Sequence, residues 1–177
     1  MGTVEVNGYT IEPGADLNRA KLKGANLEGV DLRQADLEGA DLEGANLAGA
    51  NLTEAFLRAA DLSGADLRQA DLEVADLRAA DLWRTDLTGA VLLGVDLRGA
   101  SLDRVKLRGS DFSEADLSGA NLGGTWLGGA NLGTANLSGA NLGGARLSRA
   151  NLSGAIADQD TQWPDGFDPV AAGVIIE

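Results

Sequence analysis

The chain has 177 residues, with 14 basic and 27 acidic side chains and a net charge of −13. It contains no Cys, which excludes disulfides and thiolate chemistry, and no His, the commonest general base and metal ligand. No apolar run is long enough to span a bilayer, and the first residues lack the basic and apolar segments of a signal peptide, so we expect one cytoplasmic domain without direct affinity for membranes or nucleic acid.

Residues 1–14 predict an N-terminal cap. Two short alternating segments, residues 3–6 and 9–12, flank Asn7-Gly8. Asn-Gly between alternating segments is a strong signal for a hairpin with a two-residue turn. Pro13-Gly14 then marks a turn into the next part of the chain. We therefore expect residues 2–12 to form a hairpin that covers one end of the domain.

Residues 15–154 repeat a five-residue motif. Every fifth residue from Leu17 to Leu152 is Leu, except Phe112, which gives 28 consecutive positions. The residue two places earlier is Ala at 22 of these positions, and the residue just before Leu is usually Asp or Asn. Gly occupies the second place after Leu 16 times. The motif therefore reads Ala-(Asp/Asn)-Leu-x-x.

A period of five fits neither regular helix nor flat strand. On an α-helix, successive Leu residues would be about 140° apart and would form no stripe. On a strand they would alternate between faces. A chain that turns once per repeat instead buries Ala and Leu together, and Gly suits the turn position that needs positive φ. Four corners of about 90° close one coil of roughly 20 residues.

The motif resembles that of the pentapeptide-repeat family over residues 15–154. The resemblance implies an all-β fold, a right-handed quadrilateral parallel β-helix of about seven coils with Ala and Leu inward, and no cofactor. Each coil buries its Leu residues only by stacking on its neighbours. We interpret Val95, Val105 and Phe112 as substitutions within this core.

Residues 155–177 break the repeat and predict a C-terminal cap. Residues 163–167 supply bulky apolar side chains to cover the last coil. Asp168-Pro169 is typical of a helix start and Gly173 of a helix end, so we expect one short helical turn. Residues 174–176 are apolar and predict a last strand. Apolar tails of this kind are compatible with a homodimer formed through an end cap, whereas a cap that fits the last coil well would leave a monomer; the sequence leaves both open.

Residues 20 apart should stack in columns on the outer surface, which suggests two acidic columns beside a basic one. The acidic columns favour either a metal ladder or an acid–base pair, or a solvated face on which Asp supports local turns and pairs with Arg. We favour the solvated face, and predict no metal site and no catalytic residue. The columns are Asp76, Asp96 and Asp116; Asp41, Asp61 and Asp81; and Arg58, Arg78 and Arg98.

Apolar residues at outward positions suggest a surface for a partner. Phe56 and Trp126 stand just before their Leu. A cluster of them on one face in adjacent coils is a candidate partner or dimer surface, to which we add one exposed aromatic residue. The alternative is that these are scattered surface apolar residues, which need no partner. The candidate residues are Val74, Val91, Leu93 and Trp83.

We therefore expect a non-enzymatic, rigid interaction or structural module that binds an unidentified protein. The family resemblance implies an alternative, a DNA mimic that binds or inhibits DNA gyrase. Acidity is concentrated in residues 28–86, with 14 acids and five bases, whereas residues 118–154 hold no acid. The candidate acidic band for such mimicry consists of Asp61, Asp66, Asp71, Asp76 and Asp81.

Overall fold

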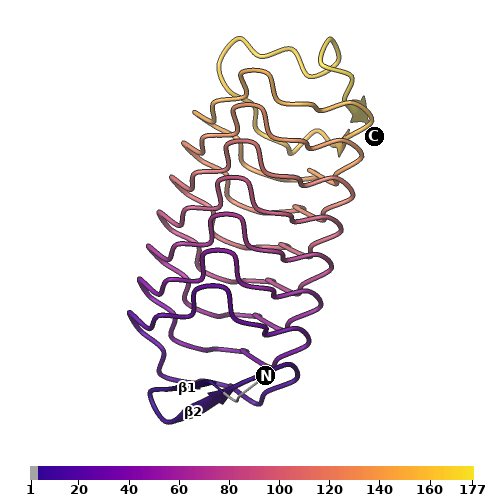
Figure 1. The fold of residues 1–177 in the computed structure, drawn as a ribbon. Coiled ribbons are helices and arrows are strands. Elements are labelled where there is room, and N and C mark those ends of the chain that lie inside the picture. The colour runs from indigo at the N-terminus through magenta and orange to yellow at the C-terminus, as the bar shows by residue number, and fades with distance from the viewer. Residues whose placement is uncertain (1–3) are drawn as a thin grey trace.

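The computed structural model describes residues 4–177, which wind into a stack of coils with the two chain ends at opposite ends of the stack (Figure 1). Parallel bridges join each residue that precedes a central Leu to the residue 20 positions later, from Asp16–Asp36 to Asn131–Asn151. One coil therefore takes four repeats and has four sides. The described residues contain no helix. The right-handed sense and the number of coils stay predictions.

Each repeat ends in a tight turn. The N–H of Ala20, for example, donates to the carbonyl of Leu17 at 2.9 Å. The second residue after Leu has positive φ at all 28 positions, between 54° and 72°, which explains the frequent Gly there. Twelve of these positions carry a side chain, including the β-branched Val74 and Thr134, for which this conformation is strained.

Backbone hydrogen bonds run along the stack in both directions. The N–H of Leu17 donates to the carbonyl of Asp36 at 2.7 Å, and the N–H of Asp36 donates to Ala15 at 2.9 Å. At the turn, the backbone N–H of Arg19 donates a further hydrogen bond to the carbonyl of Glu38 at 2.8 Å. Because this set repeats along the stack, the main-chain groups find partners without long strands or helices.

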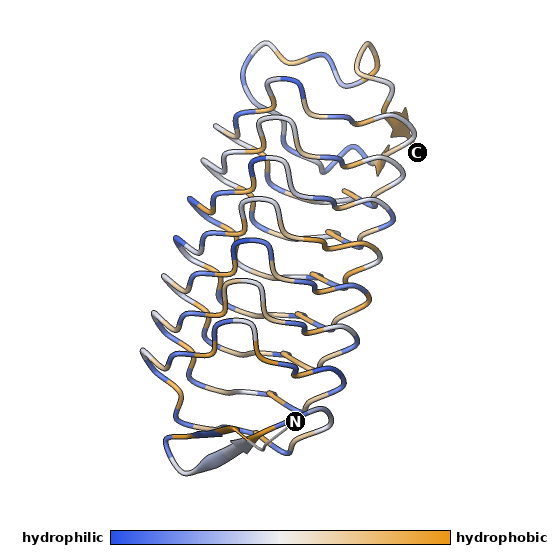
Figure 2. Ribbon diagram, viewed as in Figure 1, coloured by the Kyte–Doolittle hydropathy of each residue, from blue (hydrophilic) through white to orange (hydrophobic). Residues whose placement is uncertain are grey.

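The inward assignment of Ala and Leu is confirmed. Every central residue from Leu17 to Leu142 is at most 1% exposed, and these side chains form one continuous core. Figure 2 shows the apolar segments recurring in register in successive coils. Phe112, Val95 and Val105 are also fully buried, which confirms that they substitute within the core.

Three small polar side chains are buried among the Ala positions. The hydroxyl of Thr85 donates to the carbonyl of Leu62 in the preceding coil at 2.7 Å. Ser110 and Thr125 donate to the Leu carbonyl three residues earlier in their own turns. Each hydroxyl is therefore satisfied by a backbone oxygen, so these polar side chains are tolerated in the apolar core.

The predicted N-terminal hairpin is present. Strand β1 (Val4–Val6) pairs antiparallel with β2 (Tyr9–Ile11), and Asn7-Gly8 form the two-residue turn with φ values of 52° and 83°. Ile11 is buried against the core. The Tyr9 hydroxyl accepts the N–H of Lys21 at 3.1 Å, which ties the hairpin to the first coil. Residues 2 and 3, also assigned to this cap, lie outside the described residues.

The C-terminal cap begins as a continuation of the stack, whereas the sequence suggested that the repeat ends at residue 155. Ile156 bridges Asn136 in the usual register, and Gln162 bridges Asn141 after one extra residue. The inward places are taken by the fully buried Ala157 and by Thr161, which is 8% exposed. The irregular spacing hid this partial coil in the sequence.

Bulky side chains then cover part of the last coil, as expected. The rings of Trp163 and Phe167 stack at 5.3 Å and pack against the core. Strand β3 (Ile156–Ala157) pairs in parallel with β4 (Ile175–Ile176), which confirms the last strand. Val174 is buried, but both side chains of β4 are exposed and cover nothing.

The prediction of a short C-terminal helix is wrong. Asp168 does accept the N–H of Ala171 at 3.0 Å, as a helix cap would, and Gly173 has the expected positive φ of 87°. However, the spacing of the next bonds is irregular: the N–H of Ala172 donates to Asp168 four residues earlier, that of Gly173 to Val170 three earlier, and that of Val174 to Pro169 five earlier. No single helical spacing repeats, so the segment forms a turn.

Candidate functional site

The outer surface consists of straight columns of side chains, as predicted from the 20-residue spacing. Asp41, Asp61 and Asp81 are successive neighbours in one ladder, and Asp76, Asp96 and Asp116 in another. Ladder neighbours lie about 4.8 Å apart along the stack. The chemistry of each column therefore depends on what else its carboxylates contact.

The Asp or Asn before each Leu supports the following turn. Asp61 Oδ1 accepts the N–H of Ser63 at 2.9 Å and its hydroxyl at 2.6 Å. The same contact to the residue two places later recurs along the stack, from Asp16 to Asn151. These carboxylates therefore serve the local fold, which is the role that the sequence favoured for them.

Several Asp residues also hold an Arg in a two-pronged ion pair. Arg78 donates to Asp76 through Nε at 2.8 Å and Nη2 at 2.5 Å, and these bonds hold the pKa of Asp76 below its usual range. Arg78 also lies 3.6 Å from Asp96 in the next coil. The Arg33–Asp31, Arg68–Asp66 and Arg98–Asp96 pairs have the same geometry.

This pairing follows a simple rule in the repeat. An Arg just after Leu is neutralised when Asp stands just before the same Leu, because both side chains then project from one side of the turn. Arg58 belongs to the predicted basic column but follows Phe56 and Leu57, so it has no such partner. The basic column therefore differs from one coil to the next.

The candidate acidic band does not form one face. Asp61 and Asp81 share a ladder, whereas Asp66, Asp71 and Asp76 each belong to a different one. The five carboxylates therefore encircle the stack, and two of them, Asp66 and Asp76, are paired with Arg. A flat partner cannot contact all five at once.

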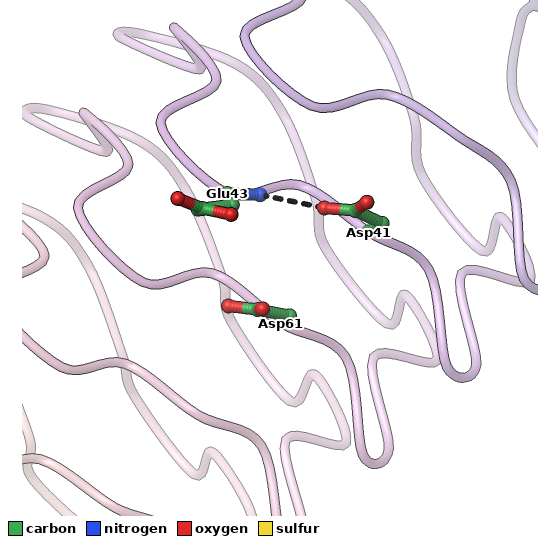
Figure 3. Close-up of side chains that lie close together, drawn as sticks. All are labelled: Asp41, Glu43 and Asp61. Carbon is green, nitrogen blue, oxygen red and sulfur yellow. Dashed lines mark hydrogen bonds between the residues drawn. The ribbon is translucent and has the colours of Figure 1, made fainter.

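One acidic group has the spacing of metal ligands. Carboxylate oxygens of Asp41, Glu43 and Asp61 lie within 4.8 Å of one another (Figure 3). Asp41 accepts the N–H of Glu43 at 3.4 Å, and Glu43 forms an ion pair with Lys23. The group is half-buried at most and one ligand is already neutralised, so its contacts are those of a solvated surface.

The structure brings together three of the four residues in the candidate partner surface. Val74 donates its N–H to the carbonyl of Leu93 at 2.9 Å, and its side chain packs beside Gly94. Val91 precedes Leu93 by two residues on the same side; Val74 is 57% exposed and Val91 39% exposed. Trp83 lies two corners further along the coil, on the opposite side, and does not join the cluster.

The surface has shallow hollows of up to about 440 Å³. One of these lies around Phe56, between Asp36, Asp76 and Arg58. Its open shape and its paired charges offer no enclosed place for a reacting substrate.

A second hollow of about 440 Å³ has a different lining, and sequence analysis missed it. It is lined by Arg84, Arg104 and Gly124, which share one turn position in successive coils, and by Lys106 and Trp126, which are neighbours in the adjacent ladder. The sequence signal was present, since Lys106, Trp126 and Arg146 are 20 residues apart and therefore stack. The net charge of the whole chain is an average, and it does not indicate this local group of cations.

Comparisons with known proteins agree with the coiled architecture. The pentapeptide-repeat profile matches residues 13–47, 40–78, 75–113 and 115–154. The chain therefore belongs to the pentapeptide-repeat family, whose members are built as repeat scaffolds. No curated protein sequence matches the chain at a significant level. In residues 4–177, no helix has the length and apolar character needed to cross a membrane.

Solved structures of the same family resemble the chain. HetL, a pentapeptide repeat protein involved in heterocyst differentiation regulation in the cyanobacterium Nostoc sp. strain PCC 7120, is 31% identical, with a TM-score of 0.43, over 94% of this chain and 86% of HetL. A protein from the Arabidopsis thaliana thylakoid lumen is 34% identical over 54% of this chain and 59% of its own, with a TM-score of 0.40. A variant of QnrB1, a plasmid-mediated fluoroquinolone resistance protein, is 25% identical over 94% and 88%, with a TM-score of 0.49.

Proposed function

We propose that the chain is a non-enzymatic cytoplasmic scaffold that binds a protein partner through Val74, Val91 and Leu93. The observation that carries this proposal is the conformation of Val74. Its φ of 57° is strained for a β-branched residue, and its side chain is mostly exposed. A strained, exposed Val gains little for the fold at a position where Gly is the commonest residue, and this favours a contact outside the chain.

The partner surface is tested by affinity capture with matched variants. Immobilised wild-type protein and the Val91→Ser/Leu93→Ser variant are exposed to lysate of the source cell, and bound proteins are quantified after stepwise elution with salt. We expect the variant to lose at least tenfold of a partner that Trp83→Ser, the control on the opposite side, still retains. Equal recovery by all three proteins would contradict the assignment of this surface.

The alternative function is DNA mimicry directed at DNA gyrase. The concentration of acids in residues 28–86 supports it, whereas the distribution of the acidic band around the stack and its Arg pairs oppose it. Supercoiling by purified gyrase separates the two functions. A mimic inhibits gyrase and loses that inhibition when Asp61, Asp66, Asp71, Asp76 and Asp81 are changed to Asn, whereas the scaffold has no effect in either form.

We also propose that the C-terminal cap supports a homodimer. Ile175 and Ile176 on β4 and the nearby Val170 expose apolar side chains at the end of the stack. Strand β4 pairs with β3 on one side and leaves its other edge unpaired among the described residues. Light scattering after size-exclusion chromatography should give a dimer for the wild type and a monomer for Ile175→Ser/Ile176→Ser. A monomeric wild type would refute this part of the proposal.

A further inference from the structure

Several basic side chains gather around Trp126. Arg108 follows Lys106 and Leu107, so the position that holds Asp beside other arginines is itself basic. Arg84 and Arg146 form no ion pair with a carboxylate of residues 4–177, and neither does Arg108. Together with Trp126 and two cations that do have an Asp partner, they define a basic–aromatic patch, which consists of Arg84, Arg104, Lys106, Arg108, Trp126 and Arg146.

The ladder fixes the geometry of this patch. Trp126 is the direct neighbour of Lys106 in one coil and of Arg146 in the next. Trp126 is 51% exposed, and the Arg146 guanidinium carbon lies over its ring, 4.7 Å from the ring centroid. Gly124, two residues earlier, lines the same hollow together with Arg84 and Arg104.

The patch keeps a positive charge although the chain is acidic. Two carboxylates reach it: Asp86 lies 3.1 Å from Lys106, and Asp103 lies 3.6 Å from Arg104. Five cations against two carboxylates leave a local charge of +3. Asp66 in the acidic band lies two ladder steps from Lys106, about 10 Å, which is comparable to the Debye length of about 10 Å at 0.1 M salt, so it lowers the potential at that edge of the patch; Trp126 is one step further away.

We propose that the basic–aromatic patch binds single-stranded nucleic acid. An exposed indole beside an excess of cations suits a ligand that alternates flat bases with phosphates. One base stacks on Trp126 in the hollow, while Arg84 and Arg104, which line it, contact neighbouring phosphates. An acidic protein segment satisfies the cations but offers a flat ring only where it carries an aromatic residue, whereas every nucleotide carries one, and a duplex keeps its bases stacked inside. The inference is independent of the Val74 surface.

The test is fluorescence anisotropy with a fluorescein-labelled oligothymidylate and the full-length protein at low salt. We expect saturable binding that weakens as salt rises, because each phosphate contact releases counterions. Trp126→Ala should weaken binding about 5- to 150-fold, which is the contribution of one base–aromatic stack. Phe56→Ala is the matched control, since Phe56 has the same exposure of 51% and the same place in its repeat, and it should bind as the wild type does.

A second variant keeps the proposal falsifiable if Trp126→Ala unfolds. Lys106→Glu/Arg108→Glu reverses two exposed charges and should abolish binding, whereas Arg78→Glu, at an arginine already paired with Asp76, should change the affinity less than threefold. No binding by the wild type at low salt would overturn the proposal. Equal affinity of wild type and Trp126→Ala, or displacement of the oligonucleotide by an equal charge of polyglutamate, would also overturn it.

Discussion

The extent to which a central Leu is buried should determine how much its replacement by Ala lowers the free energy of unfolding. Leu87 is 1% exposed, and its N–H donates to the Lys106 carbonyl at 2.8 Å. Because such bonds hold the coil spacing, the coils cannot close around a missing side chain, and Leu87→Ala should cost about 3 kcal/mol, within the range of fully buried sites. Leu147 lies three coils further along the same ladder and is only half-buried, beside a hollow lined by Pro164 and Phe167.

Leu147→Ala loses only part of its apolar contact, and water replaces the side chain without leaving a void. We expect a cost of about 1 kcal/mol. Urea denaturation followed by circular dichroism measures both variants, and an unchanged slope with denaturant shows that the same surface unfolds. Equal decreases in the free energy of unfolding at the two sites would refute the reasoning, since they would mean that a Leu covered by coils on both sides contributes no more than one at the end of the stack.

Three further predictions concern the turns, the acidic side chains and the cap. Gly49→Val should lower the free energy of unfolding by about 1–2 kcal/mol, because Gly49 has φ of 65°, whereas Ala48→Val in the same turn should change it little; thermal melting of both variants decides this. The pKa values of Asp66 and Asp76 are lowered by their Arg partners, so their contribution is complete above an ordinary pKa of about 4 and is lost as the pH falls below it. The urea midpoint should therefore drop below pH 4, with a smaller drop in Asp76→Asn, and an equal drop in both would argue against the ion pair. Removal of residues 156–177 exposes the last coil and should cause self-association in sedimentation velocity, so a dispersed monomer would contradict the capping role.

The sequence predicted those features that depend on local residue spacing and turn chemistry. The 28-fold repeat placed the core, and Asn7-Gly8 placed the hairpin, because period and turn chemistry act locally. Sequence reasoning failed at Asp168, where the correct cap residue was followed by irregularly spaced hydrogen bonds rather than a helix, and at the partial coil, where one extra residue before Thr161 concealed the register. The individual Arg–Asp ion pairs became apparent only from the turn geometry in the structure, which places the two side chains together.

The candidate surfaces depended on how columns combine around the stack. Val74 and Leu93 could be joined from the 20-residue spacing alone. The basic–aromatic patch draws on three columns, represented by Arg104, Lys106 and Arg108, and Arg84 and Arg104 line one hollow with Trp126. Average charge carries no information on such a local arrangement, so the expectation that nucleic acid is not bound could not account for it.

Because all repeats are equivalent, the direction in which a surface residue faces around the stack axis depends on how many residues precede it. Inserting 20 residues between two coils would lengthen the stack by about 4.8 Å and leave every column in line. Inserting five residues would preserve each buried Leu and each turn, yet rotate everything beyond it by one side. An insertion of one repeat between Leu93 and Arg104 would therefore move Trp126 and its neighbouring cations a quarter turn relative to the Val74 cluster and would leave Arg84 behind. Gain or loss of a single repeat can thus reorient or divide a surface without altering the core.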